Sequence, residues 1–301
     1  MIKVSNLVFD YPNHRALDTV SFEITKGSIT ALVGPNGSGK TTLLMCLSAL
    51  VKPFSGTIAV NGIDVIEHPT SCKKMIGFLH DFFGLYENLS IRQVFTYFAH
   101  AHKVEKNKID SLVLETTEKL NLSNKIDERV GNLSRGMKQR VAIGQSIIHK
   151  PLVLLLDEPA SGLDPEARHS LSELFKELNN QGMTLIVSSH ILAELNDYAK
   201  DIIVLKEGQI IEKKMEMVLK PKKQILISVL NSDNGLLKFL ENSTNVESFN
   251  QKGNSIHLEF IGSEEEQSEL LKNIIHQNYN ISEFFVKQES IQDKYLNMVK
   301  G

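Results

Sequence analysis

The sequence predicts an α/β protein built on a doubly wound, mainly parallel sheet. Three short segments, 151–156, 185–187 and 202–205, are aliphatic on both faces, as strands in the middle of a parallel sheet are. Helix-patterned sequence alternates with these strands, as expected where helices cover both faces of a sheet. Ligands of such sheets bind at the carboxyl ends of the strands. The charged residues that follow the strands are therefore the first candidates for chemistry.

Length and composition allow one large domain and a smaller one. The chain has 301 residues, 42% of them hydrophobic and 23% charged. A net charge of −3 gives no sign of binding through phosphate neutralisation, so we expect no nucleic-acid partner. Cys46 and Cys72 lack metal-ligand spacing, which favours free thiols in a reducing compartment. No apolar run approaches the ~20 residues that span a bilayer, so any transmembrane pore must come from another polypeptide.

The first part of the chain reads as a sheet-forming domain with a helical insertion. We expect short strands at 2–9 and 20–24, and a buried strand at 29–33 that leads through a glycine-rich loop into an apolar helix at 43–50. From 82 to about 150, aliphatic residues recur at helical spacing between polar ones. This stretch predicts a helical subdomain.

The last part of the chain reads as a small α+β domain behind a linker. Lysines cluster around Pro221, which indicates the linker. The elements expected beyond it are a strand at 225–230, a helix at 235–240, a strand at 255–260 and a helix at 264–276. We therefore place the first domain at 1–215 and an accessory domain at 222–301.

A phosphate-binding loop follows the strand at 29–33. The segment fits the pattern G-x-x-x-x-G-K-[ST], and its residues, with one more threonine, are Gly34, Pro35, Asn36, Gly37, Ser38, Gly39, Lys40, Thr41 and Thr42. The glycines let backbone N–H groups turn toward phosphate oxygens, and the following helix directs its positive end there. Lys40 is expected on the β- and γ-phosphates and Thr41 on Mg²⁺. The predicted ligand is a nucleoside triphosphate with Mg²⁺.

A GTPase is one class that this loop allows. The segment 81–84 is similar to a D-x-x-G element, and 107–110 and 124–127 both match the guanine-reading N-K-x-D pattern. In GTPases, however, that motif follows a buried strand, whereas both copies here lie in charged, helix-patterned sequence. Solvated helix faces are the favoured interpretation.

Four further motifs follow the loop in the order found in the ABC (ATP-binding cassette) family, which the chain resembles. They are a signature-like Leu-Ser-Arg-Gly-Met-Lys-Gln-Arg at 133–140, a Walker B strand at 152–158 that ends in Asp-Glu, a D-loop Ser-Gly-Leu-Asp at 161–164, and a Ser-Ser-His switch at 188–190. The resemblance is strong over 1–212. It implies a RecA-like mixed sheet with an antiparallel β subdomain and a helical subdomain, and ATP as the nucleotide.

The resemblance also implies residue roles. Asp157 would bind Mg²⁺, and Glu158 would act as general base toward the attacking water. His190 would donate to the γ-phosphate, with Lys40 as a further catalytic group. Tyr11 stands where the family carries the aromatic that stacks on adenine.

In the family the signature meets the nucleotide of a second cassette, so that two ATP molecules are closed in a head-to-tail dimer. By this resemblance Ser134 and Gly136 contact the partner's γ-phosphate, and Asp164 of the D-loop belongs to the same nucleotide-binding set. The dimer would be a homodimer or a heterodimer of cassettes.

Two positions depart from the family pattern. Arg135 and Met137 replace a glycine and the glutamine of the common signature, a variant similar to those of drug, antibiotic and polysaccharide exporters. We expect Arg135 to add positive charge at the dimer interface. Where the family carries the Q-loop glutamine, the chain has His80 followed by Asp81, a candidate oxygen ligand of Mg²⁺. We expect Asp81 to tune hydrolysis or its coupling.

The resemblance implies an ATP-binding and ATP-hydrolysing subunit of an ABC transporter, of exporter type, on the inner face of the cell membrane. Its partner would be a transmembrane permease subunit that docks on the loop 82–86, and its tail at 290–296 is similar to the end of such exporters. The alternative is a soluble ABC ATPase of translation or DNA maintenance. Such proteins usually show fused cassettes, coiled coils or zinc motifs, which this sequence lacks.

Overall fold

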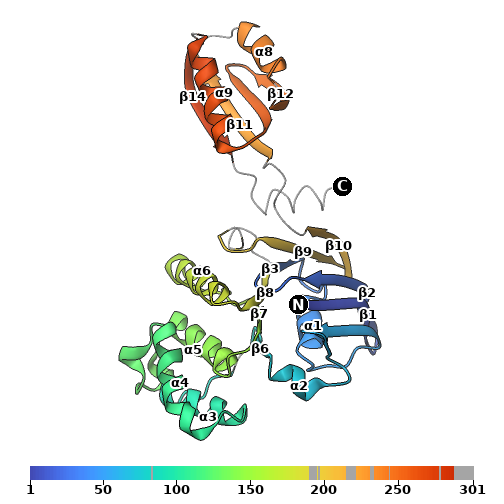
Figure 1. The fold of residues 1–301 in the computed structure, drawn as a ribbon, viewed down its shortest axis with the longest axis vertical. Helices are drawn as coiled ribbons and strands as arrows, with labels where there is room; N and C mark the ends of the chain where they lie inside the picture. Colours follow the sequence, from blue (N-terminus) through green and yellow to red (C-terminus); the bar gives the residue numbers. More distant parts are fainter. Residues whose placement is uncertain are drawn as a thin grey trace. The chain divides into compact units, whose positions relative to one another are not determined.

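The computed structural model describes residues 1–82, 84–189, 195, 197–214, 222–230, 234–243, 245–277 and 279–287. The chain divides into two compact units, 1–215 and 216–301. Each unit has a sheet and a hydrophobic core of its own (Figure 1).

A six-stranded mixed sheet forms the centre of the first unit. Its order is β10-β9-β3-β8-β7-β6, in which β10 runs antiparallel to β9 and the other neighbours are parallel. The bounds are β3 Ile29–Val33, β6 Ile76–Leu79, β7 Val153–Asp157, β8 Thr184–Ser189, β9 Asp201–Lys206 and β10 Gln209–Lys214. Every residue of β3, β7 and β8 is buried, which explains the aliphatic runs in these strands.

An antiparallel sheet of order β2-β1-β4-β5 forms the second layer of this unit. Its strands are β1 Ile2–Tyr11, β2 His14–Ile24, β4 Ser55–Val60 and β5 Ile63–Asp64. One cluster of buried side chains joins both sheets and helix α1 (Lys40–Leu47), and it includes Leu17 of β2, Leu43 of α1 and Leu155 of β7. The helix predicted at 43–50 thus begins three residues earlier, inside the phosphate loop. A short helix, α2 (Pro69–Lys73), follows β5.

The other helices of the first unit follow β6 in the sequence. Of these, α3, α4 and α5 lie together, away from the antiparallel sheet (Figure 1). The bounds are α3 Ile91–Ala101, α4 Lys106–Lys119, α5 Arg135–Ile147 and α6 Pro165–Asn180, with short 3₁₀ turns at Ser123–Lys125 and Val130–Asn132. α3 begins with a capping box, in which Ser90 and Gln93 satisfy each other's backbone N–H groups. Among the described residues, no helix is both long and apolar enough to cross a membrane.

The second unit has the β-α-β-β-α-β order of ferredoxin-like folds. Its elements are β11 Lys222–Val229, α8 Asn234–Glu241, β12 Val246–Lys252, β13 Ser255–Ile261, α9 Glu264–His276 and β14 Ile281–Lys287. The sheet order is β12-β13-β11-β14, with every pair antiparallel. The sequence predicted two of these four strands. The others, β12 and β14, are half-exposed along much of their length and show no clear apolar alternation.

A glycine inside α5 allows the helical subdomain to pack. A Cβ at Gly144 would lie 2.3 Å from Cζ of Phe95 on α3 and 2.7 Å from Cδ1 of Leu120. Both of these side chains are fully buried, so neither has free space to move into. The closeness of α3 and α5 therefore depends on the absence of a side chain at 144.

The substitution Gly144→Ala should destabilise the protein although alanine is the better helix former. The gain in helix propensity is ~1 kcal/mol, whereas overpacking a closed core costs ~1–3 kcal/mol. We expect a net loss of ~1 kcal/mol in the free energy of unfolding by urea titration. Combining it with Phe95→Leu should recover part of the loss; an alanine at 144 that raised stability would contradict the packing.

Candidate nucleotide-binding site

The loop between β3 and α1 needs glycine at three positions. A Cβ at Gly34 would lie 2.1 Å from the carbonyl oxygen of Leu205, and one at Gly39 would lie 2.5 Å from that of Ala16. Gly37 and Gly39 also have φ angles of 79° and 104°, where side chains are strained. The chain therefore turns tightly against its neighbours, and Gly39 caps the helix that starts at Lys40.

Lys40 is buried at the start of α1 and points back over the loop. Its Nζ donates to the carbonyl oxygens of Gly34 at 2.9 Å and Pro35 at 3.3 Å. It also lies 3.8 Å from Oε1 of Glu158, with 7% of the lysine side chain and 15% of the glutamate side chain exposed. Burial lowers the pKa of Lys40, while the carboxylates of Glu158 and Asp157 act to raise it. The ammonium group thus lies between the loop and the end of β7.

The loop contains a buried hydroxyl without a partner. The side chain of Ser38 is 3% exposed, and its Oγ makes no hydrogen bond. Buried polar atoms are nearly always paired, so this hydroxyl is available for a hydrogen bond to a bound group. Ser38 belongs to the loop that precedes α1, and the N-terminal end of this helix directs its N–H groups and positive dipole toward the loop, an arrangement that suits an anion. These observations fit a bound phosphate chain.

A cavity of about 330 Å³ lies beside the loop. This volume is within the range of small-molecule sites. The residues that line it are Tyr11, His14, Ala16, Asn36, Gly37, Gly39, Lys40, Thr41, Thr42, Asp81 and Glu158. Eight of these were named from the sequence as nucleotide or metal contacts, and Glu158 was named as the base. No sequence pattern pointed to His14 or Ala16, which come from the start of β2.

A buried carboxylate joins α1, β7 and β8. Asp157 is 1% exposed; its Oδ2 accepts from Oγ1 of Thr41 at 2.7 Å and its Oδ1 accepts from Oγ of Ser188 at 2.6 Å. A carboxylate removed from water needs such donors. The hydroxyl of Thr41 and the carboxylate form an oxygen donor pair at the edge of the cavity, which is the ligand chemistry that Mg²⁺ prefers.

Glu158 leaves the strand in a different direction from Asp157. Its φ of 47° is in the left-handed region, which costs a non-glycine residue ~1–2 kcal/mol. Its backbone N–H donates to Oγ of Ser188 at 3.0 Å, which helps hold this conformation. The turn takes the side chain of Glu158 to the cavity and to Lys40, while Asp157 stays buried in the sheet.

Tyr11 ends β1 at the rim of the same cavity. Its ring is 42% exposed, its hydroxyl lies 3.4 Å from Oγ1 of Thr42, and Phe9 packs edge-on against it at 5.0 Å. One face of the ring therefore has a fixed support while the rest is accessible to a ligand. A flat aromatic in this state can stack on a nucleobase.

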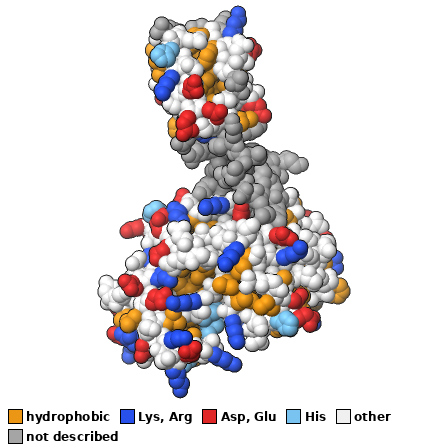
Figure 2. Space-filling model, in the orientation of Figure 1, with side chains coloured by type: hydrophobic (Ala, Val, Ile, Leu, Met, Phe, Trp, Pro, Cys, Tyr) orange, Lys and Arg blue, Asp and Glu red, His pale blue; other side chains and the backbone are white. Residues whose placement is uncertain are grey.

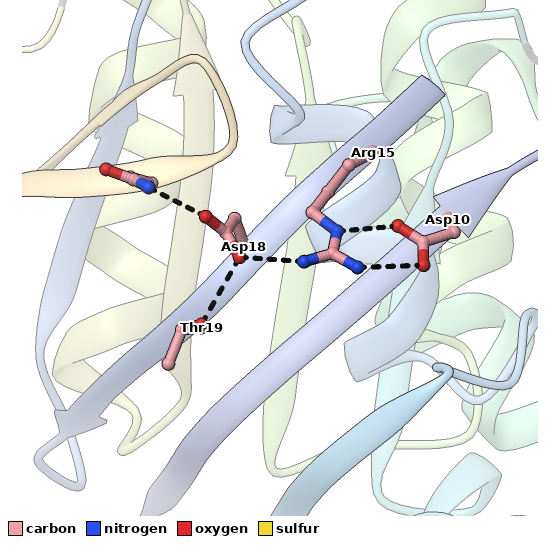
Figure 3. Close-up of polar contacts among 5 residues, drawn as sticks. Asp10, Arg15, Asp18 and Thr19 are labelled. Carbon is pink, nitrogen blue, oxygen red and sulfur yellow. Dashed lines mark hydrogen bonds and ion pairs between the residues drawn. The ribbon is translucent and has the colours of Figure 1, made fainter. Parts of the chain in front are cut away.

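Surface polar contacts hold the hairpin that carries Tyr11 (Figure 3). Arg15 binds both carboxylate oxygens of Asp10, at 2.9 and 3.3 Å, and reaches Asp18 at 3.2 Å. Asp18 also accepts from Gln209 of β10 at 2.7 Å, a contact that is the largest cause of its lowered pKa. The backbone of Gly208 accepts from Asp18 and donates to Ser38, so the network connects the hairpin to the phosphate loop.

The signature residues lie at the start of α5, away from the cavity beside the loop. Ser134 caps this helix by accepting from the N–H of Met137 at 3.3 Å, and Asp164 caps α6 by accepting from that of Ala167 at 2.9 Å. A Cβ at Gly136 would come no closer than 3.4 Å to Ala167. Ser134, Gly136 and Asp164 do not line the cavity of their own chain. The structure thus separates these three residues from the phosphate loop.

Asp81 occupies an exposed position after β6. It lines the cavity beside the phosphate loop and also a second one, of about 440 Å³, that reaches Arg135 on α5. The structure therefore brings it near the loop, as its assignment as a metal ligand requires. His190, the predicted switch residue, lies outside the described residues, as do Phe83 and the tail segment 290–296. The two N-K-x-D segments fall in α4 and in the 3₁₀ turn after it, and neither lines the cavity.

The geometry defines a class of protein. Strand β3 is followed by the glycine loop and helix α1. Strand β7 is separated from β3 by β8 in the sheet, and it ends in a buried aspartate that is followed by an accessible glutamate. A phosphate loop with an acidic strand end across the sheet is the arrangement of P-loop nucleoside triphosphatases.

Comparison with known proteins identifies the family. Residues 17–161 match the family model described as ABC transporter. The chain is 30% identical over 299 residues to the uncharacterized ABC transporter ATP-binding protein YxlF of Bacillus subtilis, covering 99% of each chain. It is 28% identical over 307 residues to the bacitracin transport ATP-binding protein BcrA of Bacillus licheniformis, covering 100% of this chain and 98% of that one. The chain belongs to the ATP-binding proteins of ABC transporters.

A solved structure shows the same cassette fold. The dimeric post-hydrolysis state of the ATP-binding cassette MJ0796, bound to ADP and Pi, is 26% identical and superposes with a TM-score of 0.64, covering 71% of this chain and 98% of that one. The predicted fold class is thereby confirmed, and the chain is the ATP-binding, ATP-hydrolysing subunit of a transporter. Relatives named for import and for export both match, so family membership does not set the direction of transport. None of these proteins supports the alternative role in translation or DNA maintenance.

Ser188 is a residue whose contacts the sequence did not predict, since a serine at a strand end has no distinctive pattern. Its hydroxyl bridges the Asp157 carboxylate and the N–H of Glu158. Ser188→Ala leaves both groups without this partner, and we expect a loss of ~1–3 kcal/mol in the free energy of unfolding together with a lower ATPase rate.

The matched control is Ser172→Ala. That serine is also buried, but it donates only to a carbonyl one turn back in α6. Thermal unfolding and ATPase assays compare the two variants, and equal behaviour of both would contradict the bridging role of Ser188.

Proposed function

We propose that the cavity beside the phosphate loop binds ATP with Mg²⁺. Lys40 and the N–H groups at the start of α1 would hold the phosphates, with Gly34, Pro35, Asn36, Gly37, Ser38 and Gly39 forming the loop and Thr42 the following turn of helix. Tyr11 would stack on adenine at the rim. The observation that carries this assignment is the glycine loop and buried Lys40 at the N-terminal end of α1, which line the cavity together with Glu158.

The metal would bind at the oxygens of Thr41, which lines the cavity, and of Asp157, which accepts from Thr41 at 2.7 Å. Asp81 lines the same cavity and would be a third oxygen donor. Bound there, Mg²⁺ supplies charge neutralisation for the phosphates. Thr41, Asp157 and Asp81 all offer oxygen ligands, which is the donor type that Mg²⁺ prefers.

Glu158 would accept the proton of the attacking water. Its left-handed backbone directs the carboxylate to the cavity, where its distance of 3.8 Å from Lys40 is long enough for the pair to separate when phosphate binds. A base on a rigid strand end aligns the water without reorganisation, which is most of what phosphoryl transfer needs from a protein. His190 would add a donor to the γ-phosphate.

The signature and the D-loop would serve a second cassette. Ser134, Gly136 and Asp164 lie too far from the local phosphate loop to line its cavity, which leaves them free to complete the site of a partner. The similar cassette MJ0796 is described as a dimer bound to ADP and Pi. We therefore propose an ATP-driven, head-to-tail dimer of this chain with itself or with a related cassette.

A groove on the first unit would take the transmembrane subunit, and so bring the chain to the membrane. It has a volume of about 400 Å³ and its lining includes Leu50, Gly84 and Phe98. Near it, Phe82 is 89% exposed and Tyr97 is 52% exposed. Figure 2 shows apolar side chains exposed between charged ones on the face of this unit that it draws. Aromatic and aliphatic groups around a groove are typical of protein interfaces.

Export is the direction that we propose. The support is the signature variant at 133–140 and the match over the whole chain, accessory unit included, to a bacitracin transport protein. The transmembrane subunit would determine the substrate.

The test of the proposed chemistry is Glu158→Gln. Without a base, turnover should fall about a hundredfold or more while ATP binding persists, and the ATP-bound dimer should accumulate in size-exclusion chromatography with ATP. Glu166→Gln, an exposed acid in the first turn of α6, is the control and should hydrolyse ATP normally. Full turnover by the Glu158→Gln variant would show that Glu158 is not the general base.

The role of Asp81 is tested by titrating Mg²⁺ in ATPase assays of Asp81→Asn. Loss of one exposed carboxylate ligand should raise the half-saturating Mg²⁺ concentration up to about fivefold, the equivalent of ~1 kcal/mol, with little change in rate at saturation. Asp110→Asn, on the exposed face of α4, should match the wild type. An unchanged Mg²⁺ requirement in the Asp81 variant would exclude it as a ligand.

A further inference from the structure

Arg135 contacts the D-loop of its own chain. It is the first residue of α5, directly after the signature serine, and its Nη2 donates to the carbonyl oxygen of Ser161 at 3.2 Å. The sequence led us to expect this charge at the surface toward a partner cassette. In the structure the side chain is exposed and its guanidinium lies against the loop 161–164, a contact that the sequence did not indicate.

Gly162 accommodates this contact by having no side chain. A Cβ built at Gly162 would lie 2.0 Å from Nη2, 2.4 Å from Cζ and 2.6 Å from Nη1 of Arg135. The flat group therefore covers the Cα of Gly162, which has a φ of 66°. Arginine at 135 and glycine at 162 thus form a matched pair, since a side chain at the second position would displace the first.

The D-loop lies between two fixed points. At one end is Glu158, whose carbonyl accepts from the N–H of Ser161 at 3.1 Å, and at the other is Asp164, the cap of α6. Ser161 and Gly162 are exposed between them. A contact from α5 at this point fixes the part of the loop that is farthest from both anchors.

The same end of α5 also holds the loop after β6. Lys138, one turn beyond Arg135, forms an ion pair of 2.9 Å with Glu87. Arg135, Lys138, Glu87 and Ser161 all line the cavity of about 440 Å³ that also reaches Glu158. The N-terminal end of α5, the signature helix, is thereby bonded to the D-loop through Arg135. Through Lys138 it is also bonded to the segment after β6 that is proposed to lie near the transmembrane subunit.

We infer that Arg135 is a positioning residue that fixes the D-loop to the signature helix, so that both meet a partner cassette as one rigid surface. The inference rests on the proposed roles of these two elements in the dimer. Both would approach the same nucleotide of the partner, so an error in their relative position would misplace groups around the reacting phosphate. Positioning of this kind acts on the rate of the chemical step more than on substrate affinity.

The decisive experiment is a double-mutant cycle in the full chain, with wild-type Glu158. Arg135→Ala should lower kcat roughly threefold to tenfold, with KM for ATP within about twofold, because Tyr11 and the phosphate loop are untouched. Arg135→Lys should restore part of the rate, since lysine keeps the charge and one donor but not the planar group. Arg129→Ala, an exposed arginine of the same subdomain, is the control.

The second arm of the cycle is Gly162→Ala, which displaces the guanidinium. The effects should not multiply: Arg135→Ala with Gly162→Ala should be no slower than the slower single variant, because the two changes break the same contact. The inference is overturned if Arg135→Ala has the wild-type kcat, if the two losses multiply, or if the loss follows a fall in Tm. Failure of the base assignment would appear separately, as turnover by the Glu158→Gln variant.

Discussion

The carboxylate of Asp157 is the interaction on which the rest of the site depends. It is buried at the end of β7 and accepts from Thr41 on the phosphate loop helix and from Ser188 at the end of β8. Three segments far apart in the sequence are thus fixed by one charged group that cannot remain buried without donors. Ser188 in turn holds the N–H of Glu158, so the strained turn that presents this glutamate depends on the same network.

In the first unit, the residues proposed to bind the nucleotide and those proposed to complete a partner's site lie in different places. Its phosphate loop, hairpin and strand ends form a cavity for one nucleotide, whereas the signature and the D-loop lie elsewhere on the same unit. Under the proposed function, one cassette can hold ATP alone, and a second cassette completes the catalytic surface. Dimerisation then becomes the event that nucleotide binding can control, which is how ATP can drive a conformational cycle.

Much of the fold and of the candidate site could be predicted from the sequence, because the strongest sequence signals are local. The segment 29–42 combines a buried strand, a glycine loop and a helix, and each of these has its own pattern. The orientation of Arg135 could not be predicted, because it depends on a contact with Gly162, 27 positions away, whose only local sign is a missing side chain. The bridging contacts of Ser188 were missed for the same reason. Strands β12 and β14 escaped prediction because they are half-exposed and lack a clean alternation.

Metal binding tests the central role of Asp157 most directly. Mn²⁺ in place of Mg²⁺ can be followed by electron paramagnetic resonance of the purified chain with and without ATP. We expect the wild type to bind Mn²⁺ tightly when ATP is present, and Asp157→Asn to bind ATP still but to lose most of this Mn²⁺ affinity. An Asp157→Asn variant that binds Mn²⁺ and ATP as the wild type does would contradict that role.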